Sequence, residues 1–249
     1  MQSYNLLNQE EKVAQPPVRF AFTIGRTTGI VLLLQLITAL TLPFILTKPI
    51  TLGSPAFLTA VAEHSSQIRM AVLLSFVGAA LTVYLGITVF RGLQLYSKSA
   101  ALLFLVVCTV SCILDVVHAS TILSMLSFSN AFVTSGAPNA EVYQVAGIAV
   151  ASARRSAHST QLIAIGAWMF VFYISLLRFK LIPRVLAVMG IIGIALQFIG
   201  VTAMMLLGYR LIGEMAMPML PIQITVAVWL IFKGFNDHPP KFVAISNIK

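Results

Sequence analysis

Charged residues are scarce in this chain. They make up 9% of its 249 residues, with 16 bases and 7 acids, whereas a soluble domain carries roughly 25%. Hydrophobic residues reach 59%, and the mean hydropathy is +0.95. So few charges cannot cover a globular surface. The composition therefore excludes a soluble globular protein, a disordered chain and a nucleic-acid binder, and it indicates an integral membrane protein.

Cysteines and the common catalytic motifs are also scarce. The two cysteines, Cys108 and Cys112, lie four residues apart in one apolar stretch, and two residues of one helix are poorly placed for a disulfide. The sequence has no glycine-rich phosphate loop, no G-x-S-x-G, no H-E-x-x-H and no paired-cysteine metal motif. These absences exclude a disulfide scaffold and leave no sign of a nucleotide site.

Six apolar stretches are long enough to cross a bilayer, which takes about 20 residues of helix. Helix is the expected conformation because an open strand in lipid leaves its backbone groups unpaired. The stretches are residues 27–46, 70–90, 100–125, 159–177, 185–207 and 217–232. The predicted fold is all-α, a polytopic bundle of six transmembrane helices over residues 27–235. Residues 1–26 and 236–249 are expected to form terminal cytoplasmic segments.

Lysine and arginine are unevenly divided between the two sides of this bundle. Eleven fall on the side of the termini: Lys12, Arg19, Arg26, Arg91, Lys98, Arg178, Lys180, Arg184, Lys233, Lys241 and Lys249. Five fall on the other side: Lys48, Arg69, Arg154, Arg155 and Arg210. Because cytoplasmic loops are the richer in bases, we expect both termini in the cytoplasm.

The first of two long outer connections, residues 48–69, is expected to be structured. Ser54–Pro55 is a capping serine followed by a proline at the first helical position, which favours the start of a helix. A short helix is therefore predicted over residues 56–65. Its apolar face would carry Phe57, Leu58 and Val61.

The second outer connection, residues 126–158, is also expected to be structured. Within it, residues 142–153 form a stretch of twelve positions without any charged residue. Twelve residues are too few to span a bilayer. We therefore expect them to form an interfacial or re-entrant helix on the outer face of the bundle.

Two phrases of the sequence carry a resemblance to a known family. Residues 181–184 read Leu-Ile-Pro-Arg, and residues 229–235 read Trp-Leu-Ile-Phe-Lys-Gly-Phe. With six spans at this length, the chain resembles the bacterial membrane family catalogued as domain of unknown function 4386. The resemblance implies a six-helix bundle in the bacterial cytoplasmic (inner) membrane, with no established activity. It also implies a glutamate six residues before the tryptophan, where this chain has Gln223.

One acidic side chain lies deep within a predicted span. Asp115 is fifteen residues into the third span, about 22 Å along its axis. Ser111 and His118 lie on the same helix face, one turn to either side. An ionisable residue in a span costs about 2.5–3.5 kcal/mol on insertion scales and usually marks function.

Polar side chains of two other spans are expected at a similar depth. His158 and Gln161 begin the fourth span on the outer side, and Gln223 lies about 9 Å into the sixth. We therefore expect a cavity between the third, fourth and sixth spans, roofed by residues 142–153. Its lining would include Asp115, His118, His158 and Gln223, with Gln161 alongside.

Two further glutamines are expected at deeper levels. Gln35 lies in the first span, and Gln197 lies in the fifth. The fifth span also carries the small residues Gly190, Gly193 and Gly200, which permit a close helix contact. Gln197 would donate a hydrogen bond across that contact.

Three interpretations of the outer cluster stay open. The leading one is a site for a lipid or another small polar or amphiphilic ligand, in a receptor, a transporter or an accessory protein. The alternative is a metal-dependent lipid hydrolase, in which Asp115, His118 and His158 ligate zinc and activate a water. The third is a structural partner of another membrane protein. Arg154 and Arg155 would either bind an anionic ligand or lipid phosphate, or mark the water boundary.

Overall fold

The structure is a computed structural model that describes residues 18–42, 57–136, 140–208 and 212–236. These residues form α-helices and contain no strand. Six of the helices are long and apolar enough to cross a membrane, which confirms the all-α polytopic bundle. The helices are α1 (Val18–Thr41), α2 (Phe57–Glu63), α3 (Ser65–Leu93), α4 (Lys98–Thr134), α5 (Ala140–Arg178), α6 (Arg184–Leu207), α7 (Ile212–Ala216) and α8 (Met219–Lys233).

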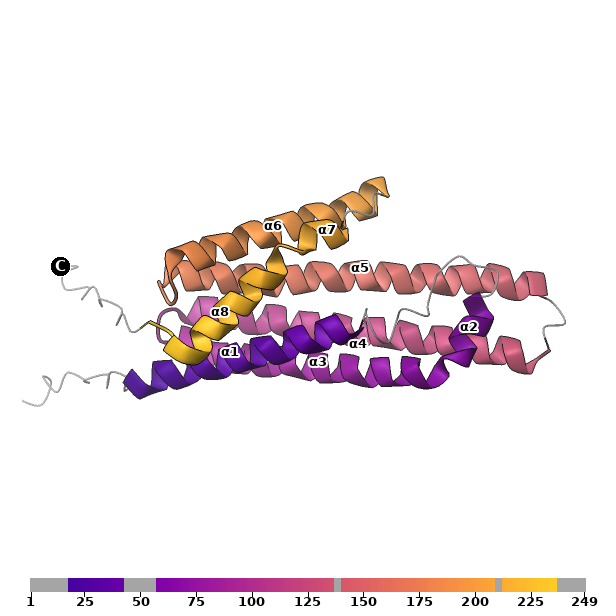
Figure 1. The fold of residues 1–249 in the computed structure, drawn as a ribbon, viewed down its shortest axis with the longest axis horizontal. Helices are drawn as coiled ribbons and strands as arrows, with labels where there is room; N and C mark the ends of the chain where they lie inside the picture. The colour runs from indigo at the N-terminus through magenta and orange to yellow at the C-terminus, as the bar shows by residue number, and fades with distance from the viewer. Residues whose placement is uncertain (1–17, 43–56, 137–139, 209–211, 237–249) are drawn as a thin grey trace, which may run out of the picture.

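The six long helices form a ring in which each packs on two neighbours. α1 packs on α3 and α8, α4 packs on α3 and α5, and α6 packs on α5 and α8. Figure 1 shows them aligned with the long axis of the molecule, with α8 crossing α1 obliquely. A core of apolar side chains that includes Phe104, Phe172 and Leu230 fills the ring near the end where α1 begins and α8 ends.

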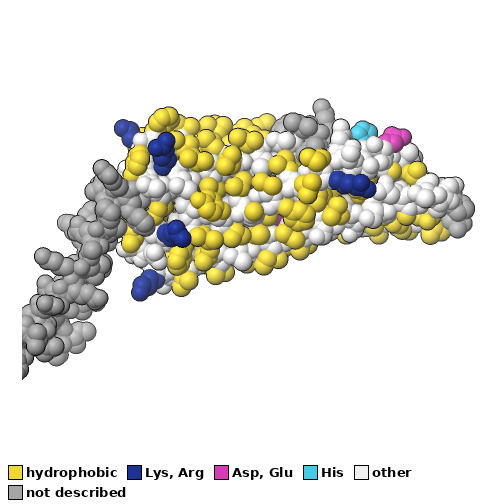
Figure 2. All heavy atoms as spheres, turned by 90° about the horizontal axis from the view of Figure 1, so that it is seen from below, with side chains coloured by type: hydrophobic (Ala, Val, Ile, Leu, Met, Phe, Trp, Pro, Cys, Tyr) yellow, Lys and Arg dark blue, Asp and Glu magenta, His cyan; other side chains and the backbone are white. Residues whose placement is uncertain are grey.

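Basic side chains gather at that same end, which we call the basic end (Figure 2). Arg69 and Arg91 are 22 residues apart on α3, and Arg155 and Arg178 are 23 apart on α5. At 1.5 Å per residue these separations are about 33 and 35 Å, close to the roughly 30 Å hydrocarbon thickness of a bilayer. Arginines therefore mark both edges of the apolar band. The opposite end is called the far end below.

The two phrases that carry the family resemblance meet at the basic end. The backbone N–H of Asn236, just after the second phrase, donates to the carbonyl of Leu181 in the first at 2.8 Å. Gly234 has φ +69° and packs against the backbone of Phe22 on α1. These contacts tie the end of α8 to α1 and to the turn between α5 and α6.

Small residues bring α6 close to its neighbours, as expected for the fifth span. Gly190 lies against the ring of Tyr173 on α5, and Gly193 lies against Met219 on α8. Gln197 donates from Nε2 to the carbonyl of Leu162 on α5 at 3.3 Å. The predicted hydrogen bond across a glycine-lined contact is therefore confirmed.

The helices α4 and α5 are longer than any bilayer requires. They contain 37 and 39 residues, or about 55 and 58 Å, and extend past the other spans at the far end (Figure 1). A second apolar core, with Val61, Ile122 and Met125 among its members, joins these extensions to α2 and α3. The hydroxyl of Ser129 on α4 also donates to the carbonyl of Leu58 on α2.

The expectations for the two outer connections had different outcomes. The short helix predicted over residues 56–65 is confirmed as α2, with Phe57, Leu58 and Val61 buried; Ser54–Pro55 lies outside the described residues. The separate helix predicted over residues 142–153 is wrong, because these residues continue α5 without a break. No proline interrupts that stretch, and α4 extends equally far, so α5 keeps a packing partner beyond the edge of the apolar band.

Candidate functional site

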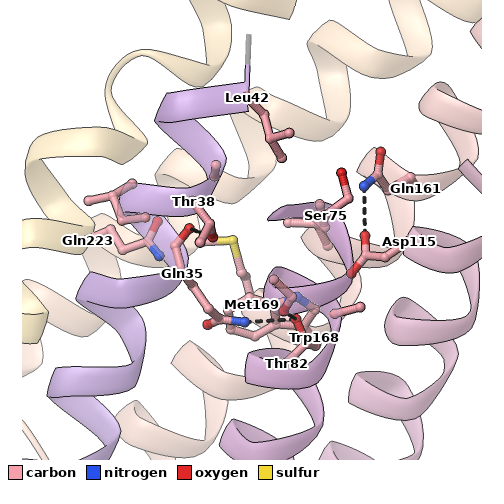
Figure 3. A pocket seen from close by; sticks show the side chains of 15 residues that line it. Gln35, Thr38, Leu42, Ser75, Thr82, Asp115, Gln161, Trp168, Met169 and Gln223 are labelled. Carbon is pink, nitrogen blue, oxygen red and sulfur yellow. Dashed lines mark hydrogen bonds between the residues drawn. The ribbon is translucent and has the colours of Figure 1, made fainter. Parts of the chain in front are cut away.

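A pocket of about 140 Å³ lies inside the helix ring (Figure 3). Its lining comes from five helices, α1, α3, α4, α5 and α8. Asp115 lies seventeen residues from the start of α4, about 26 Å from the basic end, so the pocket is in the far half of the apolar band. Trp168 and Met169 belong both to the pocket lining and to the apolar core, which closes the pocket on the basic side.

Asp115 enters the pocket from α4 and is 8% exposed. Its Oδ1 accepts a hydrogen bond of 2.7 Å from Nε2 of Gln161 on α5. The Oε1 of Gln161 lies 3.1 Å from Nδ1 of His158, one turn along α5. His158 is exposed, so these hydrogen bonds form a chain from the surface of α5 to the carboxylate.

Gln35 enters the pocket from α1, opposite this chain. Its Nε2 donates to Oγ1 of Thr82 on α3 at 2.8 Å, as the dashed line in Figure 3 shows. Its Oε1 is buried without a hydrogen-bond partner in the described part of the chain, and so is Nε1 of Trp168. A buried polar group without a partner costs about 1–3 kcal/mol. The pocket lining therefore holds one acceptor and one donor that a ligand could satisfy.

The predicted cluster is only partly assembled around this pocket. Asp115, Gln161 and Gln223 line it, whereas His118 and His158 are not among its lining residues. The two histidines lie beside each other, with ring centroids 4.9 Å apart. The predicted roof of residues 142–153 does not cover the pocket, because that segment continues along α4 in the far-end core. His118 and His158 thus belong to the α4–α5 contact.

The predicted zinc site is not formed in this structure. Nowhere in the described residues do three or more His, Cys, Asp or Glu side chains come together in a group that could hold a metal ion. The physical reason is that Gln161 lies between Asp115 and His158 and hydrogen-bonds to both. Asp115, His118 and His158 therefore do not converge on one point.

Arg154 and Arg155 lie on α5 at the far edge of the apolar band. Arg155 is exposed, and Arg154 is half-buried with its Nε lacking a partner in the described residues. Arg154 is one turn from His158 on the same helix face. Neither arginine lines the pocket, so the anionic-ligand role expected of them stays a prediction.

Sequence reasoning missed the contribution of α3 to the pocket. Ser75, Gly78, Ala79 and Thr82 line it from that helix. The hydroxyls of Ser75 and Thr82 donate within the helix, to the carbonyls of Ala71 at 2.9 Å and Gly78 at 3.1 Å. Small and hydroxyl residues at this spacing could have signalled a face turned toward a neighbour, but their low polarity drew less attention than Asp115.

Comparison with known proteins gives a family. The model of the family described as Domain of unknown function (DUF4386) matches residues 27–234. The chain belongs to this family. No curated protein and no solved structure matches it. The glutamate that the resemblance implied is Gln223 here, and Gln223 lines the pocket. Asp115 is the only acidic residue among the described residues that line the pocket.

Proposed function

We propose that this membrane protein binds a small polar or amphiphilic ligand in the pocket inside its helix ring. The observation that carries the proposal is the convergence of polar side chains on one pocket within the apolar band. Asp115, Gln35 and Gln161 reach it from three different helices. Polar residues within spans are costly and usually functional, so their convergence on one space supports binding.

A receptor or accessory role suits the pocket better than transport. Secondary transporters commonly bind their substrates at discontinuous helices near the bilayer midplane. Of the described spans that line this pocket, α1, α3, α4 and α5 each run without a break. The sixth span, residues 213–233, is interrupted at residues 217–218 between α7 and α8, so the described lining of the pocket lacks the pair of broken helices found in such transporters. The zinc-dependent lipid hydrolase is not proposed, because its three ligands do not converge. We place the protein in the bacterial cytoplasmic membrane with the basic end in the cytoplasm, on the distribution of bases.

A variant that fills the pocket tests the proposal. A Cβ built on Gly78 would meet only Oγ1 of Thr38, at the ordinary distance of 3.6 Å, so Gly78→Leu adds volume to the pocket without a backbone clash. Ala80 lies two residues further along α3 and is exposed, which makes Ala80→Leu the matched control. Thermal unfolding of each protein would be followed with piperidine, tetrahydropyran or valerate, which are cationic, neutral and anionic at neutral pH.

The proposal expects at least one compound to stabilise both the wild type and Ala80→Leu, and none to stabilise Gly78→Leu. A ligand at about one hundred times its Kd stabilises a folded protein by roughly 2.7 kcal/mol, which is easily detected. The proposal fails if the unfolding midpoint of the wild type responds to none of the three compounds. It also fails if all three proteins respond equally.

A further inference from the structure

The pocket's carboxylate has no cationic partner in the described residues. Asp115 accepts one hydrogen bond, from the neutral amide of Gln161 to Oδ1. Figure 3 shows its second oxygen on the pocket side of the side chain. A carboxylate taken out of water is strongly unfavourable unless a charge or several hydrogen bonds compensate it. A positive charge from a ligand would supply that compensation.

The other polar atoms of the pocket add to this requirement. Oε1 of Gln35 is a buried acceptor without a donor, and Gln35 is 9% exposed. Among the described residues that line the pocket, Asp115 and Gln35 therefore each contribute, from different helices, one acceptor without a donor. Nε1 of Trp168 is a buried donor without an acceptor. A complementary ligand has at least two N–H donors near its positive charge and one oxygen acceptor.

The size and the apolar part of the lining favour an organic cation over a metal ion. Hard metal cations take six or more oxygen ligands at about 2.0–2.6 Å and favour charged carboxylates, whereas this pocket combines a single carboxylate and neutral amide and hydroxyl oxygens with the side chains of Trp168, Met169 and Ile165. Its 140 Å³ volume is close to that of an engineered cavity of about 150 Å³ that binds benzene. An indole is also the best aromatic partner for a cation.

We infer that the pocket binds a small protonated amine with an oxygen acceptor, about the size of a six-membered ring. The ammonium group donates to Asp115 and Gln35, and the oxygen accepts from Nε1 of Trp168. This inference rests on the proposed function and adds the chemical class of the ligand. Morpholine has both groups, piperidine lacks the oxygen, and tetrahydropyran lacks the amine. Because the three rings have one shape, comparing them separates the contribution of the ammonium group to the affinity from that of the oxygen.

The test measures the affinity of each ring for the protein in lipid nanodiscs. The chain has two tryptophans, so Trp229→Phe leaves Trp168 as the single fluorescent reporter, at the pocket itself. Charge-assisted hydrogen bonds are worth about 1.5–3 kcal/mol. We therefore expect morpholinium and piperidinium to bind at least tenfold more tightly than tetrahydropyran. Morpholinium should bind the most tightly of the three.

Asp115→Asn is the decisive variant. Asparagine has the same shape and keeps an oxygen that can accept from Gln161. The two amines should lose at least tenfold in affinity, while tetrahydropyran stays within about twofold of its affinity for the parent. Unchanged binding of tetrahydropyran also shows that the variant is folded.

Each outcome separates this inference from the proposed function. In one outcome, tetrahydropyran or valerate binds as tightly as the amines and loses that binding in Gly78→Leu. This result would support the pocket as a ligand site but would refute the inference that its ligand is an amine. Equal amine affinity in the parent and Asp115→Asn would also overturn it. A fluorescence response to sodium that is absent with potassium, and no response to either amine, would assign Asp115 to a metal ion instead.

Discussion

Replacing Gly234 by alanine should destabilise the bundle more than the same replacement at Gly208 or Gly213. Gly234 ends α8 with φ +69° and ψ −164°, a region that is essentially restricted to glycine and costs other residues about 1–3 kcal/mol. The new Cβ would also lie 2.8 Å from Cα of Phe22 and 3.1 Å from its carbonyl oxygen. These are backbone atoms, so α1 itself has to shift, at a typical overpacking cost of about 1–3 kcal/mol.

The two contributions add to a loss of about 2–6 kcal/mol in the free energy of unfolding. Two other glycines separate them. Gly208 has φ +74° with nothing near a Cβ, so Gly208→Ala should cost only the left-handed strain of about 1–2 kcal/mol. Gly213 is helical with open space around it, so Gly213→Ala should be neutral or slightly stabilising.

The assay can use a cysteine that the chain already has. Cys108 is fully buried in the core of the ring, whereas Cys112 is half-buried. In a Cys112→Ser background, a thiol-reactive fluorophore therefore reports the exposure of Cys108 as the detergent-solubilised protein is heated or chemically unfolded. The free energy of unfolding should fall from Gly213→Ala to Gly208→Ala to Gly234→Ala. Equal values for Gly208→Ala and Gly234→Ala would refute the proposed contact between α8 and α1, and a wild-type value for Gly234→Ala would refute the strain as well.

Three further predictions concern the orientation, the far-end core and the carboxylate. In a variant without the native cysteines, a cysteine in place of Ser135 should react with an impermeant thiol reagent in intact cells, and one in place of Ser99 should not; the reverse pattern would invert the orientation. Ser129→Ala removes the hydrogen bond from α4 to the carbonyl of Leu58 on α2, at a cost of about 0.5–1.5 kcal/mol, so amide hydrogen exchange should accelerate in α2 and not in α8; uniform exchange would contradict the separate far-end core. Gln161→Ala removes the hydrogen bond to Asp115 and should lower the free energy of unfolding by about 1.5–3 kcal/mol in the ligand-free protein, whereas an unchanged value in chemical unfolding would mean that water replaces the amide fully.

The number and position of the spans were predictable because hydropathy is a local property. A stretch such as residues 185–207 is apolar whatever surrounds it, and α6 ends at Leu207 as expected. The buried face of α2 was equally predictable, since the spacing of Phe57, Leu58 and Val61 assigns them to one side of a helix. The stripe of Ser111, Asp115 and His118 is likewise buried together. Each of these results needs only the geometry of a single helix.

The end of a helix was harder to predict where it leaves the apolar band. Arg154 and Arg155 indicated a boundary at the start of the fourth span, and α5 instead begins at Ala140. Hydropathy marks where lipid ends, but a helix ends where its backbone loses hydrogen bonds or packing. The far-end core supplies that packing through residues of α4 and through residues of α2 and α3, which are distant in sequence from α5.

The membership of the pocket was decided by the tertiary structure. From the sequence alone, Asp115, Gln161 and Gln223 were expected to meet, and all three line the pocket. Gln35 and Thr82 could not be assigned to it, because their inclusion depends on α1 lying between α3 and α8. A polar residue in a span signals that it needs a partner, since lipid offers none. Which partner it meets depends on the order of helices around the ring, and that order is set by contacts such as Gly234 against Phe22, between residues more than two hundred positions apart in the chain.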